Sequence, residues 1–374
     1  MVENKKVIVH VSEVPISTSS GMGRVEYYWK EAFEKAGYTF IHIGPDEIGP
    51  VKHKGLFPYK AYSYYKNLNI APVAFIIHEP AAGVFTNKGI PCFVESHGVE
   101  RKFWESQLAG SFPSVHTNPI SFKTKILYPL WRLRNCDIGL KNADKLLLIN
   151  TDDSMYVQRK YKRPVKDIFI FKNGITKSSA IYLNKKNQLD FTVLFNGTWI
   201  DRKGIYTLIE AATQLHLQGI NIKYNLIGTS KDEQSVLADW PQSLHSSITV
   251  IPRFVASDEA ILLNEASVFV LPSFSEGQPL SLLQAMALGI CCITTNCCGQ
   301  KDLITHNKDG LLFEPGDSKT LATLIQQCYS DIDKVKIIGN QAKALVEKRT
   351  WENVSDELVE FVSTLIDCAN INTK

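Results

Sequence analysis

Short apolar segments that alternate with amphipathic helical patterns are the feature that most constrains the fold of this chain. The second half contains apolar runs of strand length at residues 191–195, 222–228, 247–252, 268–272 and 290–295. Helical patterns lie between them at residues 205–218, 258–265 and 280–289. Strands this uniformly apolar must be covered on both faces, which is typical of a parallel sheet with helices on each side.

The first half begins with the same arrangement. An apolar strand at residues 7–11 precedes a polar loop and a helix whose apolar stripe runs from Val25 to Ala36. Gly37 is a typical helix end, and a second strand follows at residues 38–44. Further strands are predicted at residues 73–77, 91–95 and 145–149. Because strand–helix–strand units build parallel sheets, both halves are predicted to be doubly wound α/β domains.

Charged residues are distributed unevenly along the 374-residue chain. Residues 1–187 contain 27 basic and 16 acidic side chains, whereas residues 188–374 contain 14 basic and 22 acidic ones. Opposite net charge in two halves of this length predicts two domains with different partners. We therefore expect one domain over residues 1–180 and another over residues 188–350, joined by the segment 178–190. The basic first domain should favour anions or an anionic surface.

Several classes of protein are excluded by the composition. No run of about 18 apolar residues is present, which excludes a membrane-spanning helix, and the N-terminus lacks the apolar core of a signal peptide. The eight cysteines occur within apolar segments, as expected for reduced thiols of a cytoplasmic protein. The pairs Cys291-Cys292 and Cys297-Cys298 lack the spacing of zinc ligands, so we expect core thiols and no metal site.

A loop with two adjacent cations follows the first strand of the second half. Gly197 ends the strand, and Arg202 and Lys203 directly precede a helix start at Gly204. Cations beside the free N–H groups of a helix start are suited to binding a diphosphate. A solvated loop with basic residues explains this segment equally well, so both interpretations stay open.

A second polar segment follows a later strand. Glu276 lies just past the strand end, and Pro279 suits the first turn of the next helix. The N–H groups of Leu280 and Ser281 would then be free to bind an anion. Ser281 and Gln284 share a helix face, so the hydroxyl would approach a phosphate and the amide a ribose. The alternative is a simple helix cap, with Glu276 favouring the helix dipole.

The order of these and other segments resembles that of glycosyltransferase family 4. The resemblance is carried by Gly21-Met22-Gly23 in the first loop, Ser96-His97-Gly98, Ala143-Asp144-Lys145, Lys172-Asn173-Gly174, Gly197-Thr198, Arg202-Lys203-Gly204, Glu276 to Gly289, the hairpin-like Asp309 to Phe313, and Thr350-Trp351-Glu352. Family 4 consists of retaining enzymes of the GT-B fold that use nucleotide-sugar donors. The resemblance implies two Rossmann-like domains facing a cleft, with a last helix over residues 354–370 that returns to the N-terminal domain.

The resemblance also implies catalytic roles. Arg202 and Lys203 match cations that neutralise the departing diphosphate, and Glu276 matches a glutamate that hydrogen-bonds the donor sugar. His97 matches a histidine near the 6-hydroxyl of the sugar. Gly23 matches a glycine that brings loop backbone against the phosphate and the acceptor. The remaining donor-binding positions implied in this way are Gly197, Thr198, Arg253, Phe254, Leu280, Ser281 and Gln284.

Two positions depart from the family pattern. Thr198 stands where the family has an arginine, which removes one cation from the phosphate site. Gln284 stands where the family has a glutamate that holds the ribose. Since charge-assisted hydrogen bonds are roughly twice as strong as neutral ones, ribose binding is expected to weaken by about 1–2 kcal/mol. We expect the enzyme to tolerate this loss, because an amide oxygen still accepts from a hydroxyl; a different donor or a weakened relative are the alternatives.

The same residues suit sugar transfer without a metal or cofactor. Fixed cations and helix N–H groups stabilise the negative charge that builds on a departing diphosphate. No carboxylate is obviously placed as a nucleophile, so we expect attack on the same face of the sugar, with retention.

A basic segment with interleaved aromatic residues occupies residues 121–145. It contains six cations against two acidic residues, together with Phe122, Tyr128 and Trp131. Such a segment either lies on an anionic bilayer and recruits a lipid-linked acceptor, or is an amphipathic helix that buries its aromatic residues. Binding to nucleic acid is not expected, because no nucleic-acid-binding motif accompanies the basic residues.

Together these patterns predict a cytoplasmic, retaining hexosyltransferase, placed at the inner face of the membrane where the basic segment binds it. The enzyme would move a sugar from a nucleotide-diphosphate sugar to a glycan or lipid-linked glycan of envelope or exopolysaccharide synthesis. A catalytically weakened nucleotide-sugar-binding protein of the same fold and a nucleotide-sugar epimerase are the alternatives.

Overall fold

The structure of the protein is a computed structural model that describes residues 6–18, 21–112, 115, 119–176, 190–255 and 257–371. The expected linker at residues 178–190 lies outside the described residues, except for Asp190. The chain divides into two compact units. Unit 1 comprises Met1–Ser111, Pro119–Asn173 and Trp351–Lys374, and unit 2 comprises Phe112–Asn118 and Gly174–Thr350. Within the described ranges, no helix is both long enough and apolar enough to cross a membrane.

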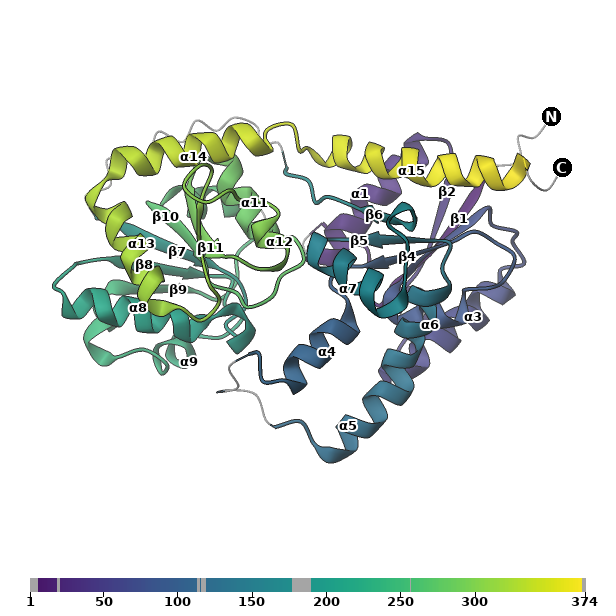
Figure 1. Ribbon diagram of the computed structural model, residues 1–374, viewed down its shortest axis with the longest axis horizontal. Helices are drawn as coiled ribbons and strands as arrows, with labels where there is room; N and C mark the ends of the chain where they lie inside the picture. Colours follow the sequence, from purple (N-terminus) through teal and green to yellow (C-terminus); the bar gives the residue numbers. More distant parts are fainter. Residues whose placement is uncertain are drawn as a thin grey trace. The chain divides into compact units, whose positions relative to one another are not determined.

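Unit 1 is built on a six-stranded sheet in the order β2-β1-β3-β4-β5-β6, and every pair is parallel. Its strands are β1 (Val7–Val11), β2 (Thr39–Ile43), β3 (Ala74–His78), β4 (Cys92–Ser96), β5 (Lys145–Leu148) and β6 (Ile168–Ile170). Its α-helices are α1 (Gly21–Lys35), α2 (Pro45–Ile48), α3 (Phe57–Asn67), α4 (Glu100–Leu108), α5 (Phe122–Tyr128), α6 (Arg134–Asn142), α7 (Thr151–Tyr161) and α15 (Trp351–Ile371). The expected parallel sheet is confirmed (Figure 1). Strand β6 was not predicted, because three half-buried residues carry too little periodicity.

Unit 2 contains a second parallel sheet, in the order β12-β11-β10-β7-β8-β9. Its strands are β7 (Thr192–Asn196), β8 (Lys223–Ile227), β9 (Ile248–Ile251), β10 (Val268–Leu271), β11 (Cys291–Thr295) and β12 (Leu311–Phe313). Its α-helices are α8 (Ile205–Leu217), α9 (Glu233–Leu237), α10 (Glu259–Asn264), α11 (Leu280–Ala287), α12 (Cys298–Lys301), α13 (Ser318–Ser330) and α14 (Ile332–Val346). In chain order this is the 3-2-1-4-5-6 arrangement of a Rossmann-like domain. The hairpin expected around Asp309 to Phe313 is wrong, because Leu311–Phe313 pairs in parallel with β11.

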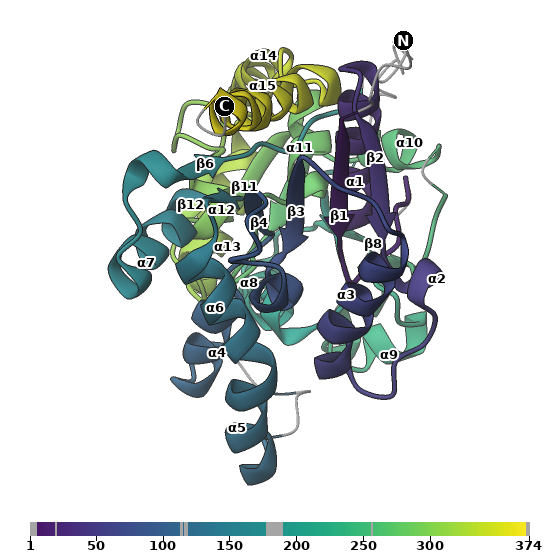
Figure 2. The same cartoon turned by 90° about the vertical axis from the view of Figure 1, so that its right-hand side faces the viewer.

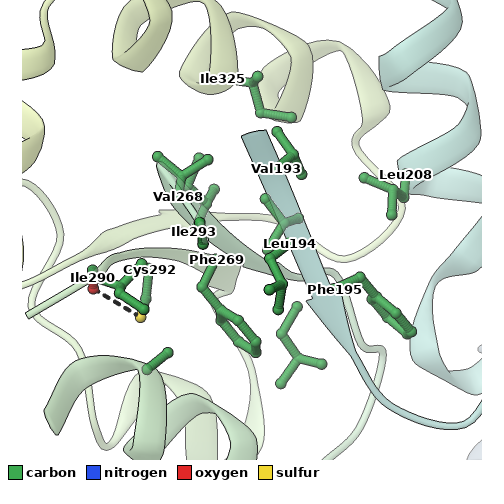
Figure 3. Packing of buried hydrophobic residues seen from close by; sticks show 14 of the residues in the cluster. Val193, Leu194, Phe195, Leu208, Val268, Phe269, Ile290, Cys292, Ile293 and Ile325 are labelled. Carbon is green, nitrogen blue, oxygen red and sulfur yellow. Dashed lines mark hydrogen bonds between the residues drawn. The ribbon is translucent and has the colours of Figure 1, made fainter. Parts of the chain in front are cut away.

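The core of unit 2 lies on both faces of its sheet. Figure 3 shows Val193, Leu194 and Phe195 of β7 beside Phe269 of β10, and all four side chains are 0% exposed. The thiol of Cys292 donates to the carbonyl oxygen of Ile290 at 3.3 Å within this core (Figure 3). Cys291 is buried beside it, so this pair forms core thiols as expected. Such burial on both faces explains why these strands are apolar at every position. Cys297 and Cys298 are only half-buried at the start of α12, so the expectation of core thiols is wrong for that pair.

The last helix of the chain packs against unit 1, as expected. In Figure 1, α15 runs alongside α1. The ring of Trp351, at the start of α15, stacks on Tyr28 of α1 with centroids 4.7 Å apart. Further along, the hydroxyl of Tyr38 donates to Ser363 Oγ at 2.9 Å. Apolar stacking and polar contacts along its length therefore hold α15 on this unit.

Candidate active site

The two polar segments of the second half meet at one edge of the unit 2 sheet. Strands β7 and β10 are neighbours, with β8 and β9 beyond β7 and with β11 and β12 beyond β10. Open α/β sheets bind ligands at the carboxyl ends of the strands where the strand order switches in this way. The loop after β7 carries Arg202 and Lys203, and the loop after β10 carries Glu276. The fold therefore brings these residues to the place where a ligand is expected.

A glycine with positive φ holds the cationic turn against the end of β10. Asp201–Lys203 form a single 3-10 turn, and Gly204 follows with a φ of +72°. A side chain here would place its Cβ 1.9 Å from the carbonyl oxygen of Pro272, so only glycine fits. The N–H of Phe274 donates to the carbonyl oxygen of Arg202 at 2.9 Å. These contacts fix the turn beside the loop that follows β10.

Two cations and one carboxylate form the centre of the site. Lys203 Nζ lies 2.6 Å from Glu276 Oε1, and Arg202 Nη1 lies 3.6 Å from Glu276 Oε2. Arg202 also donates to the carbonyl oxygen of Ser275. The side chains of Lys203 and Glu276 are only 14% and 10% exposed. Two cations against one carboxylate leave an excess of positive charge, which suits an anionic ligand.

Glu276 is held in its ionised state. Burial by itself raises the pKa of this carboxyl, but the charges of Lys203 and Arg202 and hydrogen bonds from Lys203 and Ser273 outweigh it. The pKa of Glu276 therefore lies below its ordinary value of 4.5. At neutral pH its oxygens are charged acceptors, which suits hydrogen bonds from hydroxyl groups.

The helix that follows this loop adds free N–H groups. Pro279 is the N-cap residue of α11, one position before the first turn where the sequence placed it, and no side chain of the described residues caps this helix. The first hydrogen bond of the helix runs from Leu283 N to Pro279 O, at 3.2 Å. The N–H groups of Leu280 and Ser281 therefore precede the helical ladder and carry the positive end of its dipole.

Close backbone packing fixes the loop between Glu276 and α11. The N–H of Gly299 donates to the carbonyl oxygen of Glu276 at 3.2 Å, and a Cβ at Gly299 would lie 1.4 Å from Gly277 O. Arg349 donates to the side-chain oxygen of Gln278. Sequence reasoning missed Gly299 and Arg349, because neither belongs to a local motif and both are brought to the loop by the fold.

The remaining donor-side positions lie on the segments after β7 and β9 and on α11. Gly197 directly follows β7, and a Cβ there would meet its nearest atom at an ordinary 3.5 Å, so space alone does not require glycine. Thr198 is exposed, and Gln284 is half-buried on α11. Beyond β9, Arg253 is exposed, whereas Phe254 packs against the core of unit 2.

Gly23 and His97 belong to unit 1. Gly23 was expected in a loop, but it is buried in the first turn of α1, which begins four residues before the apolar stripe. His97 follows β4, and its ring centroid lies 5.3 Å from that of Phe171. Burial, with a smaller effect of His10, lowers the pKa of His97 to about 3. His97 is therefore a neutral imidazole at physiological pH.

A group of buried titratable residues in unit 1 was not predicted from the sequence. Its members His10, Glu26, His42 and Glu95 come from β1, α1, β2 and β4. In the sequence, His10 and His42 each interrupt an otherwise apolar run, whereas Glu26 and Glu95 have other polar residues within two positions and give no such signal. Their proximity depends on strand order, which no single motif specifies.

The two sheets identify the fold class of the chain. Two parallel, Rossmann-like six-stranded sheets, the second with a cationic site at its carboxyl edge, are those of the GT-B fold. The family described as "Glycosyl transferases group 1" matches residues 182–345 of this chain. The matched segment contains the whole Arg202, Lys203 and Glu276 centre.

Curated relatives align with part of the chain. The capsular polysaccharide biosynthesis glycosyltransferase CapM of Staphylococcus aureus is 28% identical over 182 residues, which are 47% of this chain and 47% of CapM. An alpha-1,4-N-acetyl-D-galactosaminyltransferase of Campylobacter jejuni, named for an acceptor on PP-undecaprenol, is 27% identical over 67% of each chain. The chain thus spans about half the length of CapM and two thirds of the C. jejuni enzyme.

Solved structures match almost the whole chain in fold. Sucrose-phosphate synthase from Thermosynechococcus elongatus has a TM-score of 0.78 at 18% identity, covering 97% of this chain and 100% of that one. Anabaena HepE in complex with UDP and glucose has a TM-score of 0.67 at 15% identity, covering 96% and 100%. At these identities the likeness establishes the shared fold.

Proposed function

We propose that the protein is a retaining hexosyltransferase that moves a sugar from a nucleotide-diphosphate sugar to an acceptor. The observation that carries this proposal is the contact of Lys203 and Arg202 with Glu276 beside the uncapped start of α11. Cations suited to a diphosphate and a carboxylate suited to sugar hydroxyls are thus held within one site. Unit 2 would bind the donor, and unit 1 would bind the acceptor.

Departure of the diphosphate is the step that these residues would promote. As the bond from the anomeric carbon to the phosphate oxygen breaks, negative charge builds on the diphosphate. Lys203 and Arg202, with the N–H groups of Leu280 and Ser281, would stabilise that charge without reorganisation. Because Lys203 has three N–H donors and uses one on Glu276, others stay available for phosphate oxygens. We propose that this step needs no metal or cofactor.

Glu276 and His97 would bind the donor sugar, and Gly23 would lie near the phosphate and the acceptor. Glu276, kept ionised by its cations, would accept hydrogen bonds from donor sugar hydroxyls. His97, neutral at physiological pH, would hydrogen-bond the 6-hydroxyl. Gly23, in the first turn of α1, would let backbone approach the phosphate and the acceptor. The acceptor would attack from the face that the diphosphate leaves, so the configuration is retained.

The names of the relatives support a polysaccharide role. CapM is named for capsular polysaccharide biosynthesis, and the C. jejuni enzyme for a lipid-linked acceptor. HepE was solved with UDP and glucose, which supports a uridine donor as the first to test. The proposed acceptor is accordingly a glycan or lipid-linked glycan of envelope or exopolysaccharide synthesis.

An exposed apolar face on α5 and the turn after it supports contact with an anionic membrane. Figures 1 and 2 show α5 projecting from the body of unit 1. The exposed apolar side chains of this segment are Phe122, Ile126, Leu130 and Trp131, and its exposed cations include Lys123 and Lys125. Phe122 is 79% exposed, so this aromatic ring does not pack in the hydrophobic core. Apolar side chains flanked by lysines suit a bilayer with anionic headgroups. The proposed location is the cytoplasm, at the inner face of such a membrane.

The second candidate function is nucleotide-sugar binding without efficient transfer. It is motivated by Thr198 and Gln284, which replace a cation and a carboxylate of the family pattern. Loss of these groups would weaken both phosphate and ribose contacts.

One assay separates the candidates. The purified protein is incubated with UDP-, GDP- and ADP-sugars, with and without lipid-linked or soluble glycan acceptors, and nucleoside diphosphate release is followed. Release that requires an acceptor supports the transferase. Binding of a nucleotide sugar without release under any condition supports the weakened protein, and interconversion of two nucleotide sugars without acceptor supports an epimerase.

A further inference from the structure

A second polar centre lies in unit 1, at the carboxyl edge of its own sheet. It joins His10 of β1, Glu26 of α1, His42 of β2, and Glu95 and His97 at the end of β4. His10, Glu26 and Glu95 are 0% exposed. Of these residues the proposed transfer uses only His97. Buried polar groups are costly unless they are paired, so the cluster requires an explanation.

Hydrogen bonds satisfy only one side of each carboxyl group. The hydroxyl of Ser12 donates to Glu26 Oε1 at 2.5 Å. His10 Nε2 lies 3.1 Å from Glu95 Oε1, and His10 Nδ1 lies 2.9 Å from His42 Nδ1. Glu26 Oε2, His42 Nε2, Glu95 Oε2 and His97 Nε2 are buried without a hydrogen-bond partner among the described residues.

Three of the four residues left with a free ligand atom also lie together. One ligand atom each from Glu26, Glu95 and His97 can be chosen so that all lie within 4.8 Å of one another. Tetrahedral zinc ligands bound at about 2.0–2.2 Å lie about 3.3–3.6 Å apart, so side-chain rotations that draw these atoms together would close this set around an ion. We propose that Glu26, Glu95 and His97 bind a divalent transition-metal ion, with Zn²⁺ as the ion of choice.

Ligand chemistry and charge both favour a divalent ion of this kind. Two carboxylates and a neutral imidazole form a mixed oxygen and nitrogen set, which Zn²⁺ accepts and which calcium or magnesium sites rarely use. Burial raises the pKa of both carboxyl groups, so binding of the ion would release their protons to solvent. The two negative charges then balance the two positive charges of the ion, and the buried site is neutral. Three protein ligands leave a fourth position for water.

A competing ligand set shares Glu26. His10, Glu26 and His42 also bring ligand atoms within 4.8 Å of one another. However, both ring nitrogens of His10 already have partners, in His42 and Glu95. His10 therefore fits a supporting role, orienting Glu95 from behind, as residues outside the ligand shell of metal sites commonly do.

Such an ion would connect α1 to the end of β4 and hold His97 in place. This role is structural and lies in unit 1, apart from the cations of unit 2 proposed to assist diphosphate departure. The inference goes beyond the proposed function and does not depend on it.

The test measures metal binding directly. The full chain carrying Cys368→Ser, which removes an exposed thiol, is stripped with a chelator, dialysed, and titrated with Zn²⁺ and in parallel with Co²⁺. We expect one Zn²⁺ per chain by elemental analysis, a Co²⁺ absorption spectrum with oxygen and nitrogen ligation, and a higher melting temperature with metal. Failure of this protein to retain Zn²⁺ or to shift in melting temperature would overturn the proposal.

Variants then identify the ligands. Glu26→Gln, Glu95→Gln and His97→Gln should each abolish the Co²⁺ spectrum, and His10→Gln should weaken binding about 10–100-fold. Glu79→Gln is the matched control, because Glu79 is a buried carboxyl of unit 1 that bonds Ser96 instead, and it should bind metal normally. Loss in His42→Gln with retention in His97→Gln would overturn the ligand assignment in favour of the competing set.

Discussion

The ammonium group of Lys203 lies 2.6 Å from Oε1 of Glu276, although 73 residues separate the two in the chain. Lys203 follows β7 and Glu276 follows β10, and these strands are neighbours at the switch in strand order. The contact places a cation beside the carboxylate that we propose binds the donor sugar, and the proposed chemistry depends on it.

Removing either partner should abolish transfer. Lys203→Ala and Glu276→Ala should each lower kcat/KM by about 10²–10³-fold, since each deletes a preorganised charge of the transition state. Steady-state kinetics measure the change in kcat/KM, and circular dichroism checks that each variant is folded. Lys223→Ala, at an exposed lysine of β8, is the control and should be unchanged. Near-normal turnover in either site variant would contradict the assignment.

The ionisation of Glu276 should depend on its neighbouring cations. Lys203 and Arg202 lower the pKa of Glu276 and outweigh the effect of burial, which raises it. The ion pair therefore stabilises the folded state above pH 4.5, the pKa in the unfolded state, and this stabilisation is lost as the pH falls through the lower pKa of the folded state. Lys203→Met should raise the pKa of Glu276, because it removes one of the two neighbouring charges that lower it. Carboxyl NMR titration of Glu276 in the natural protein and in the variant, without ligand, measures the shift, and an unchanged pKa would count against the pairing.

Restoring the family's carboxylate should strengthen donor binding. Gln284→Glu is expected to tighten binding of the nucleotide sugar by about 5–30-fold, because a charged acceptor replaces a neutral one. Binding titrations of the variant and the natural protein make the comparison. Gln327→Glu, on the exposed face of α13, adds the same charge elsewhere and should have no effect. Equal affinity in Gln284→Glu would remove Gln284 from the ribose site.

The face of α5 should determine membrane binding. Phe122→Asp removes a side chain that is 79% exposed and should weaken binding to anionic liposomes by about tenfold or more. Leu217→Asp is matched in chemistry, since Leu217 is 81% exposed on α8 of unit 2, and it should leave co-sedimentation unaltered. Binding of the natural protein should fade at high salt. Equal loss in both variants would point to unspecific hydrophobic adsorption.

Gly204 should be irreplaceable for stability. Gly204→Ala combines a φ of +72° with a Cβ only 1.9 Å from Pro272 O, so we expect a loss of about 3 kcal/mol or more in the free energy of unfolding. Gly219→Ala has a similar φ of +75° but no atom within 4 Å of the new Cβ. It should lose only about 1–2 kcal/mol, the cost of the backbone conformation. Denaturant titration of both variants separates the two effects, and similar losses would show that close packing at Gly204 contributes nothing.

Local patterns in the sequence predicted the elements but not their neighbours. The apolar runs at residues 191–195 and 268–272 predicted β7 and β10 because both faces of each strand are buried. The order of strands that joins Arg202 and Lys203 to Glu276 was implied by the family resemblance, since residue spacing alone left a solvated loop as an equal alternative. Gly23 was misplaced because α1 begins with glycine and methionine, which are weak helix-start signals.

The cluster of His10, Glu26, His42, Glu95 and His97 in unit 1 could not be predicted from local sequence patterns. His10 is the single polar residue of β1, Glu95 is one of two polar residues in β4, and their contact depends on the pairing of β1, β3 and β4. Nothing in either segment indicates the other. Sites built from several non-adjacent strands therefore emerge only once the topology is known.

The most direct test of the central claim is thermal unfolding of the natural protein and Lys203→Ala with UDP, GDP and ADP and their sugar conjugates. At 100 times its dissociation constant, a ligand stabilises the folded state by about 2.7 kcal/mol, which is readily measured. We predict that the conjugates of one nucleotide raise the melting temperature of the natural protein and that Lys203→Ala loses this shift. The absence of any shift in the natural protein, or an equal shift in Lys203→Ala, would contradict a donor site built on Lys203 and Glu276.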